Sequence, residues 1–84
     1  MPGPRSVRIS RRTEKVLETL DARSQEQMKT ALRELSISPL LGKKLKGELE
    51  GLRSYRLGTF RIIYRFSELA VEIVSLDDRK DVYR

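Results

Sequence analysis

Arginine side chains are concentrated in the most strand-like stretch of the chain, which reads RLGTFRIIYRF from Arg56 to Phe66. A guanidinium group holds phosphate through two parallel hydrogen bonds, and it keeps its charge at physiological pH. Two such groups on a rigid sheet would form a clamp for phosphate. This stretch is therefore a candidate for phosphate binding, or for chemistry at a phosphate.

The dipeptide Gly58-Thr59 predicts a two-residue hairpin turn, in which glycine supplies the positive φ of the first turn position. The hairpin register places Arg56 directly opposite Arg61. The face of the two arginines also carries Ser54, Ile63 and Arg65, and the other face is a predicted core face of Tyr55, Leu57, Phe60, Ile62, Tyr64 and Phe66. Like charges in direct opposition destabilise a sheet, so the arginine pair needs a counter-charge or a use.

A solvated surface is the competing interpretation of these arginines. If Ser67-Glu68 forms the next turn, Glu72 pairs with Ile63 and lies diagonal to both Arg61 and Arg65. Exposed charged faces of this kind are common in folded proteins. Residue spacing alone leaves both interpretations open.

Further candidate residues lie on either side of this hairpin. Three lysines between glycines could follow a phosphate backbone or could simply be solvated: Lys43, Lys44 and Lys46. Tyr83 could move a proton or could pack on the core. Three clustered carboxylates suggest a metal site only weakly, because no matching distant carboxylate is evident: Asp77, Asp78 and Asp81. We therefore predict no metal and no cofactor.

The composition narrows the possible chemistry. Cysteine and histidine are both absent, which excludes disulfides, thiolate metal sites, a cysteine nucleophile and imidazole acid–base catalysis. The net charge is +6, with +3 in each half of the chain, and this balance indicates an anionic partner such as nucleic acid or an acidic protein. The sequence has no apolar run long enough to span a membrane. A cytoplasmic location is the expectation that follows.

The N-terminal half predicts a short strand and a helical hairpin after a loose leader over residues 1–5. The strand covers residues 6–10. Ser10 caps a helix over residues 11–20, and a capping box beginning at Ser24 starts a second helix that ends near residue 35. The expected buried faces are Val16, Leu17 and Leu20 on the first helix and Met28, Ala31, Leu32 and Leu35 on the second.

The C-terminal half predicts three strands, over residues 52–57, 60–66 and 69–76, after a segment of mostly loop at residues 40–51. One domain over residues 1–84 is the only sensible count for a chain this short. The predicted fold class is α+β, in the order β-α-α-β-β-β, with a small antiparallel sheet packed on an N-terminal helical hairpin.

This order of elements resembles the RelE/ParE superfamily of toxins from type II toxin–antitoxin systems. The resemblance rests on KLKG at residues 44–47, YRLGTFRIIYRF at residues 55–66 and DDRKDVYR at residues 77–84. It implies a RelE-like microbial RNase architecture. It also implies a hydrolase without a metal, an mRNA interferase that enters the ribosomal A site and inhibits translation. In that reaction the 2′-OH attacks the adjacent phosphate and leaves a cyclic phosphate.

The resemblance assigns roles to five positions of this chain. Lys46 matches the basic residue of the KLKG segment, and Arg56 matches a basic position of the strand before the turn. Arg61 matches the arginine that contacts the scissile phosphate. Arg79 matches a C-terminal arginine, and Tyr83 matches the tyrosine that orients or activates the 2′-OH. We add Lys43, Lys44 and Lys46 as RNA-binding residues.

Two positions depart from the family pattern and keep alternatives open. Ser54 stands where relatives have a further basic residue, and Asp78 stands where many have histidine. Arg53 is adjacent to Ser54, but strand alternation directs it to the other face. The alternatives are a ParE-like inhibitor of DNA gyrase and a catalytically weak relative that only binds its antitoxin. A cognate antitoxin is the partner implied in every case.

Overall fold

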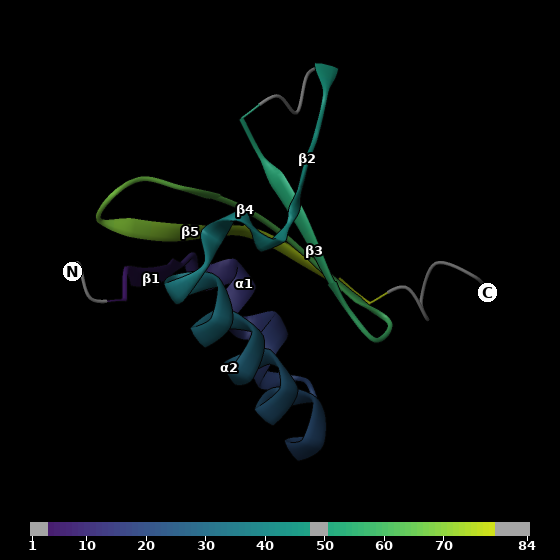
Figure 1. The fold of residues 1–84 in the computed structure, drawn as a ribbon. Coiled ribbons are helices and arrows are strands. Elements are labelled where there is room, and N and C mark those ends of the chain that lie inside the picture. Colours follow the sequence, from purple (N-terminus) through teal and green to yellow (C-terminus); the bar gives the residue numbers. More distant parts are fainter. Residues whose placement is uncertain (1–3, 48–50, 79–84) are drawn as a thin grey trace.

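The computed structural model describes residues 4–47 and 51–78, in which two α-helices pack on one face of a five-stranded sheet (Figure 1). The helices and the sheet form two layers, so the predicted α+β class is confirmed. In chain order the elements are β1 (Ser6–Ile9), α1 (Arg11–Glu18), α2 (Ala22–Ile37), the 3₁₀ helix η1 (Pro39–Leu41), β2 (Lys43–Lys44), β3 (Arg53–Leu57), β4 (Phe60–Phe66) and β5 (Ala70–Asp78).

The two helices begin at side-chain caps, one of them predicted correctly. Ser10 Oγ accepts a hydrogen bond from Thr13 N at 3.1 Å and caps α1 as expected. The prediction of a capping box at Ser24 was wrong, because Asp21 caps α2 and accepts from Ser24 N at 2.8 Å. Because the cap lies three residues earlier, α2 begins at Ala22, between the two predicted helices.

The sheet has the strand order β1-β5-β4-β3-β2 and is mixed rather than wholly antiparallel. Its β1 lies parallel to β5, since the helical hairpin carries the chain across one face and back. The predicted β3–β4 register is confirmed at every pair, including Leu57 with Phe60 and Arg56 with Arg61. Gly58 has φ 61°, as the turn requires.

The β4–β5 turn lies one residue later than predicted. Ser67 N donates to Ala70 O at 2.8 Å, and Ser67 Oγ accepts from Leu69 N and Ala70 N, which places Glu68-Leu69 at the tip of the turn. As a result Glu72 pairs with Arg65, and our prediction that it opposes Ile63 was wrong. An irregularity between Ile63 and Tyr64 then shifts the remaining pairs by one more residue.

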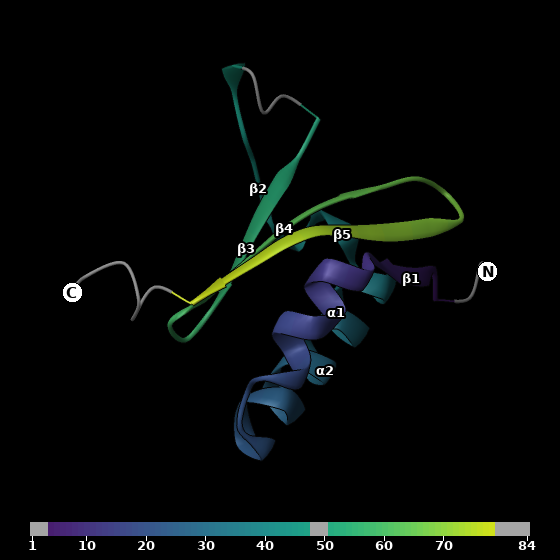
Figure 2. The ribbon, with the colours of Figure 1, turned by 180° about the vertical axis from the view of Figure 1, so that it is seen from behind.

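Within the expected loop at residues 40–51, the structure contains η1 and the short strand β2. Lys43 pairs with Ser54 and Lys44 with Arg53, so β2 forms the outer edge of the sheet. In Figure 1 the β2–β3 ribbon rises away from the helices, and the view from behind in Figure 2 agrees. Residues 48–50 lie outside the described part of the chain.

The core lies between the helices and the covered face of the sheet. The predicted core face of the hairpin is confirmed, with Phe60, Ile62 and Tyr64 buried and Tyr55, Leu57 and Phe66 packed around them. On α1 the prediction of Val16 was wrong, because Val16 is 39% exposed and Thr13 is buried in its place. The rest of the buried core comprises Met28, Ala31, Leu35, Val71, Ile73 and Leu76. No helix in the described residues is long and apolar enough to cross a membrane.

Candidate nucleic-acid interface on the open face of the sheet

The face of the sheet opposite the helices carries a row of three charges across three strands. Arg56 on β3 lies opposite Arg61 on β4, and Asp77 on β5 lies opposite Arg61 on its other side. Arg61 Nη2 is 3.6 Å from Asp77 Oδ2, and both side chains are about half exposed (45% and 49%). An exposed pair of this kind contributes at most about 1 kcal/mol, so Arg61 can exchange Asp77 for another anion at little cost.

A groove of about 400 Å³ adjoins this row on the β3 side. Its walls are cationic and apolar, with no acidic side chain from the described residues. The lining comprises Leu41, Lys43, Lys44, Leu45, Ser54, Tyr55, Arg56 and Arg61. The structure thus brings four of the predicted site residues together in one hollow: Lys43, Lys44, Arg56 and Arg61. A groove with these charges is suited to a polyanion such as a nucleic-acid strand.

Two buried contacts fix the segment that leads into β2, and the sequence did not reveal them. Tyr64 is fully buried; its hydroxyl donates to Pro39 O at 2.6 Å and accepts from Gly42 N at 2.9 Å. Arg53 Nη1 donates to Gly42 O at 2.6 Å. A Cβ at Gly42 would lie 2.5 Å from Tyr64 Oη, so only glycine fits this close approach. Together these contacts set the position of Lys43 at the groove.

The remaining predicted residues are not brought to this groove by the described part of the structure. Lys46 lines a different hollow, on the other side of β2. Arg79, Asp81 and Tyr83 lie outside the described residues, as does the side chain of Asp78. Arg53 points to the helix side of the sheet, as strand alternation predicted, and does not stand in for a basic residue at Ser54.

The tyrosines in the described residues are poor proton acceptors near neutral pH. The hydrogen bond from Tyr55 Oη to Glu34 Oε2 (2.9 Å), together with partial burial, raises the pKa of Tyr55. Burial raises the pKa of Tyr64, against the smaller lowering effect of its hydrogen bond from Gly42 N. Proton transfer at this groove would therefore need another group. Within residues 4–47 and 51–78, no cluster of three potential ligands is placed to hold a metal ion.

Comparison with known proteins identifies the class to which this fold and groove belong. The family model of the ParE toxin of the type II toxin–antitoxin system parDE matches residues 7–83. The chain therefore belongs to the RelE/ParE superfamily of type II toxin–antitoxin toxins.

Individual relatives lie on the RelE side of that superfamily. Toxin RelG of Mycobacterium tuberculosis is 44% identical over 57 residues, which span 64% of this chain and 66% of RelG. The toxin–antitoxin complex RelBE2 of Mycobacterium tuberculosis contains a chain with 34% identity and a TM-score of 0.82, and the match covers 90% of this chain and 92% of that one. The isolated Escherichia coli RelE toxin, at 23% identity, has a TM-score of 0.75 over 88% of this chain and 83% of its own, and this likeness concerns the fold alone.

Proposed function

We propose that this toxin is a metal-independent endoribonuclease that cuts mRNA in the ribosomal A site and so inhibits translation in the cytoplasm. The observation that carries the proposal is the juxtaposition of Arg56 and Arg61 beside Lys43 in a groove without acidic lining among the described residues. The cost of opposing two arginines on a sheet is offset when a phosphate lies between them.

The proposed reaction is attack of the 2′-OH on the adjacent phosphate. The 2′ oxygen forms a bond to phosphorus and loses its proton, the bond to the 5′ oxygen breaks, and the leaving oxygen gains a proton. The products are a 2′,3′-cyclic phosphate and a 5′-hydroxyl. Negative charge builds on the phosphorane, and fixed guanidinium groups stabilise it without moving protons themselves.

In this proposal some residues bind the negatively charged RNA backbone, and another acts on the 2′-OH. Arg61 binds the scissile phosphate and Arg56 supports it, while Lys43 and Lys44 hold the neighbouring backbone. From the family resemblance, Tyr83 is proposed to orient or activate the 2′-OH, and Arg79 is proposed as a further catalytic residue. A groove open along one face cannot enclose RNA, so a ribosome that presents the mRNA supplies the missing positioning.

We also propose a cognate antitoxin as the partner that holds the toxin inactive. Several solved relatives are toxin–antitoxin complexes, among them RelBE2 of Mycobacterium tuberculosis and RelE–RelB of Pyrococcus horikoshii. The net charge of +6 favours a partner with acidic segments.

Mapping of RNA ends after induced expression tests the proposed activity. We expect new mRNA ends within codons when the wild-type toxin arrests growth, and few such ends with Arg61→Ala or Tyr83→Phe. Arrested cells with intact mRNA would contradict the proposal, and so would full toxicity of a folded Arg61→Ala variant.

Inhibition of DNA gyrase is the second candidate, because the matching family model is that of the ParE toxin. A supercoiling assay with purified gyrase separates the two functions. Loss of supercoiling together with intact mRNA would favour this candidate.

A third candidate is a relative that binds its antitoxin without cutting RNA. The departures from the family pattern at Ser54 and Asp78 favour it, and so does the ion pair between Arg61 and Asp77. Growth arrest by the free protein would exclude this candidate.

A further inference from the structure

A β-bulge brings the side chain of Asp77 to the open face beside the paired arginines. The pairing of β4 with β5 skips Val74, which is 45% exposed. With an unbroken register Arg61 would lie opposite Leu76, and the bulge puts Asp77 in that place instead. Bulges often redirect a side chain next to an active site, so Asp77 is a candidate for a role in the chemistry.

The carboxylate of Asp77 is held more loosely than that of Glu72, which lies on the same strand and the same face. Glu72 accepts two hydrogen bonds from Arg65, at 3.3 and 3.4 Å. Asp77 Oδ2 lies 3.6 Å from Arg61 Nη2, and Asp77 accepts no hydrogen bond from residues 4–47 and 51–78. Its oxygens are therefore open to a hydrogen-bond donor of a bound ligand.

A carboxylate is the proton acceptor that the described residues of the open face can offer to a 2′-OH. The sequence has no histidine, and charged lysine and arginine side chains have no acceptor atom. The hydrogen bond to Glu34 raises the pKa of Tyr55, and burial raises the pKa of Tyr64, so both phenols keep their protons near neutral pH. Of Glu72 and Asp77, it is Asp77 that lies beside the paired arginines.

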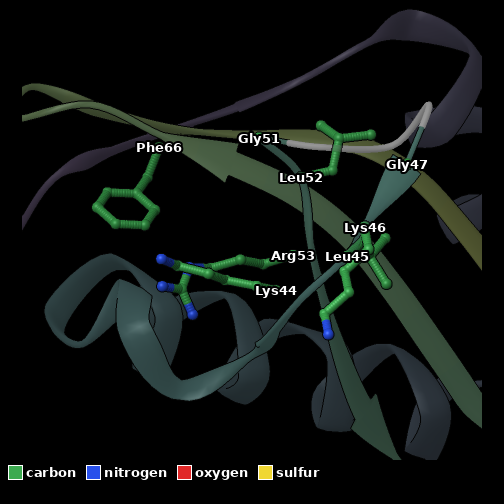
Figure 3. Close-up of a pocket in the computed structure, with 8 residues that line it drawn as sticks. All are labelled: Lys44, Leu45, Lys46, Gly47, Gly51, Leu52, Arg53 and Phe66. Atoms are coloured by element: carbon green, nitrogen blue, oxygen red, sulfur yellow. The ribbon is translucent and has the colours of Figure 1, made fainter.

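The row of Arg56, Arg61 and Asp77 places this carboxylate within reach of the reacting oxygen. Opposed residues of antiparallel strands have Cα atoms about 4.5–5.5 Å apart, so a phosphate held by the two arginines lies about one strand from Asp77. The attacking oxygen lies about 3–3.5 Å from phosphorus before reaction, and from there it can be hydrogen-bonded to a carboxylate on the next strand. Arg53 adds no third arginine to this row, because it lies beside Phe66 on the helix side of the sheet (Figure 3).

We propose that Asp77 is the general base of the cleavage reaction and accepts the proton of the attacking 2′-OH. This assignment rests on the proposed function. As the 2′ oxygen bonds to phosphorus, its proton passes to the Asp77 carboxylate. The bond from phosphorus to the 5′ oxygen breaks, and that oxygen takes a proton from water. Asp77 then returns its proton to the solvent, and Tyr83 is left with the orientation of the 2′-OH.

A counter-ion role for Asp77 predicts the opposite result for the variant Asp77→Asn. If Asp77 only neutralises Arg61, the variant frees that arginine for RNA and cuts at least as fast as the wild type. If Asp77 accepts the proton, the variant binds RNA at least as tightly but cuts about 100-fold more slowly, or worse.

Single-turnover cutting of a defined mRNA on programmed ribosomes measures the rate, and an RNA blocked by 2′-O-methylation measures the affinity. Asp77→Glu keeps a carboxylate, so its rate should stay within about tenfold of the wild type. The matched control is Glu72→Gln, which removes the other carboxylate of the same face and should change neither the rate nor the affinity.

The pH dependence of cutting gives a signature that a structural role of Asp77 would not produce. Within the described residues, Arg61 on β4 and Arg56 beyond it on β3 are the charged groups facing Asp77, and α1 and α2 lie on the other face of the sheet. The wild-type rate should level off toward neutral pH. Hydroxide must take the proton in Asp77→Asn, so its rate should rise about tenfold per pH unit without levelling off.

An mRNA with sulfur in place of the scissile 5′ oxygen separates proton acceptance from proton donation. Sulfur leaves without a proton, so this substrate should not restore cutting by Asp77→Asn. Restored cutting would place Asp77 at the leaving oxygen and overturn the assignment.

The other contrary results separate this assignment from the nuclease proposal. Cutting by Asp77→Asn at the wild-type rate, or an equal loss in Glu72→Gln, would overturn the assignment and leave the nuclease in place. Weaker binding of the blocked RNA that accounts for the whole loss of rate would also overturn it, because Asp77 would then only position Arg61. Uncut mRNA with the wild type would refute the nuclease, and the assignment with it.

Discussion

The two ends of the open face of β4 carry the same chemistry in different surroundings. Arg61 pairs with Asp77 at 3.6 Å, and Arg65 pairs with Glu72 at 3.3 Å. Both arginines are about half exposed, and each lies on β4 opposite its carboxylate on β5. An ion pair therefore does not distinguish the arginine of the candidate site from a surface arginine on this sheet.

The difference lies on the β3 side of the two arginines. Arg61 has Arg56 as its neighbour there, and both line the groove with Lys43. Arg65 lies beyond the last residue of β4 that pairs with β3. It lines neither that groove nor the hollow on the other side of β2. A second cation and a hollow beside it therefore define the candidate site, and Arg65 supplies a matched control for Arg61.

Replacement of these two arginines should give the largest contrast. Loss of one fixed donor at a developing charge typically lowers a rate by about 100- to 1,000-fold. We expect Arg61→Ala to slow inhibition of translation by that order in a purified translation system, and Arg65→Ala to change it less than about twofold. Equal losses in the two variants would mean that the groove is not the site.

The anchoring of the segment before β2 should appear as a difference in stability. Tyr64→Phe leaves the buried amide of Gly42 and carbonyl of Pro39 without their partner, at a cost of about 1–3 kcal/mol in the free energy of unfolding. Tyr55→Phe removes an exposed hydrogen bond to Glu34 and should cost less. Urea unfolding of both variants measures the difference, and a smaller cost for Tyr64→Phe would contradict it.

Neutralising the two carboxylates should change RNA binding at only one of the two ion pairs. Asp77→Asn frees Arg61 beside the groove, so we expect RNA affinity to rise a few-fold, while Glu72→Gln at the Arg65 end leaves it unchanged. Both variants should change the free energy of unfolding by less than about 1 kcal/mol, because the ion pairs are exposed. Fluorescence anisotropy with a blocked oligonucleotide measures the affinities. Weaker binding of Asp77→Asn would instead assign Asp77 a positioning role.

The smallest expected effect is a loss of stability at alkaline pH. The folded protein raises the pKa values of Tyr55 and Tyr64 above 10.0, so it holds their protons more tightly than the unfolded chain does. This contribution is fully present below pH 10.0 and is lost as the pH rises through the folded pKa values. Urea unfolding below and above pH 10.0 should show a smaller loss for Tyr55→Phe than for the wild type. An identical loss would contradict the sign.

Local patterns predicted much of this molecule because they act over short distances. The glycine turn at Gly58 and strict alternation along β3 and β4 fix which arginines face each other, so Arg56 and Arg61 could be paired from the sequence. The β4–β5 register could not be predicted in the same way. There the side chain of Ser67 moves the turn by one residue, and the irregularity between Ile63 and Tyr64 adds a second shift. Asp77 rather than Glu72 therefore lies opposite Arg61.

Contacts between segments that lie far apart in the chain could not be predicted from the sequence. The phenol of Tyr64 looked like one more core residue, and its role in holding Pro39 and Gly42 depends on a contact across more than twenty residues. Likewise, β2 is too short to show an alternating pattern, so Lys43 and Lys44 appeared to lie in a loop. Pairing with β3 gives them a fixed place beside the groove.

The chemical identity of the new RNA ends shows whether this toxin cuts mRNA by attack of the 2′-OH. Purified toxin is incubated with ribosomes programmed with a defined mRNA, and the masses of the products are measured by mass spectrometry. We expect a 2′,3′-cyclic phosphate on the upstream fragment for the wild type and for Arg65→Ala, and almost no product for Arg61→Ala. Uncut mRNA with the wild type, or equal cutting by the Arg61→Ala variant, would contradict it.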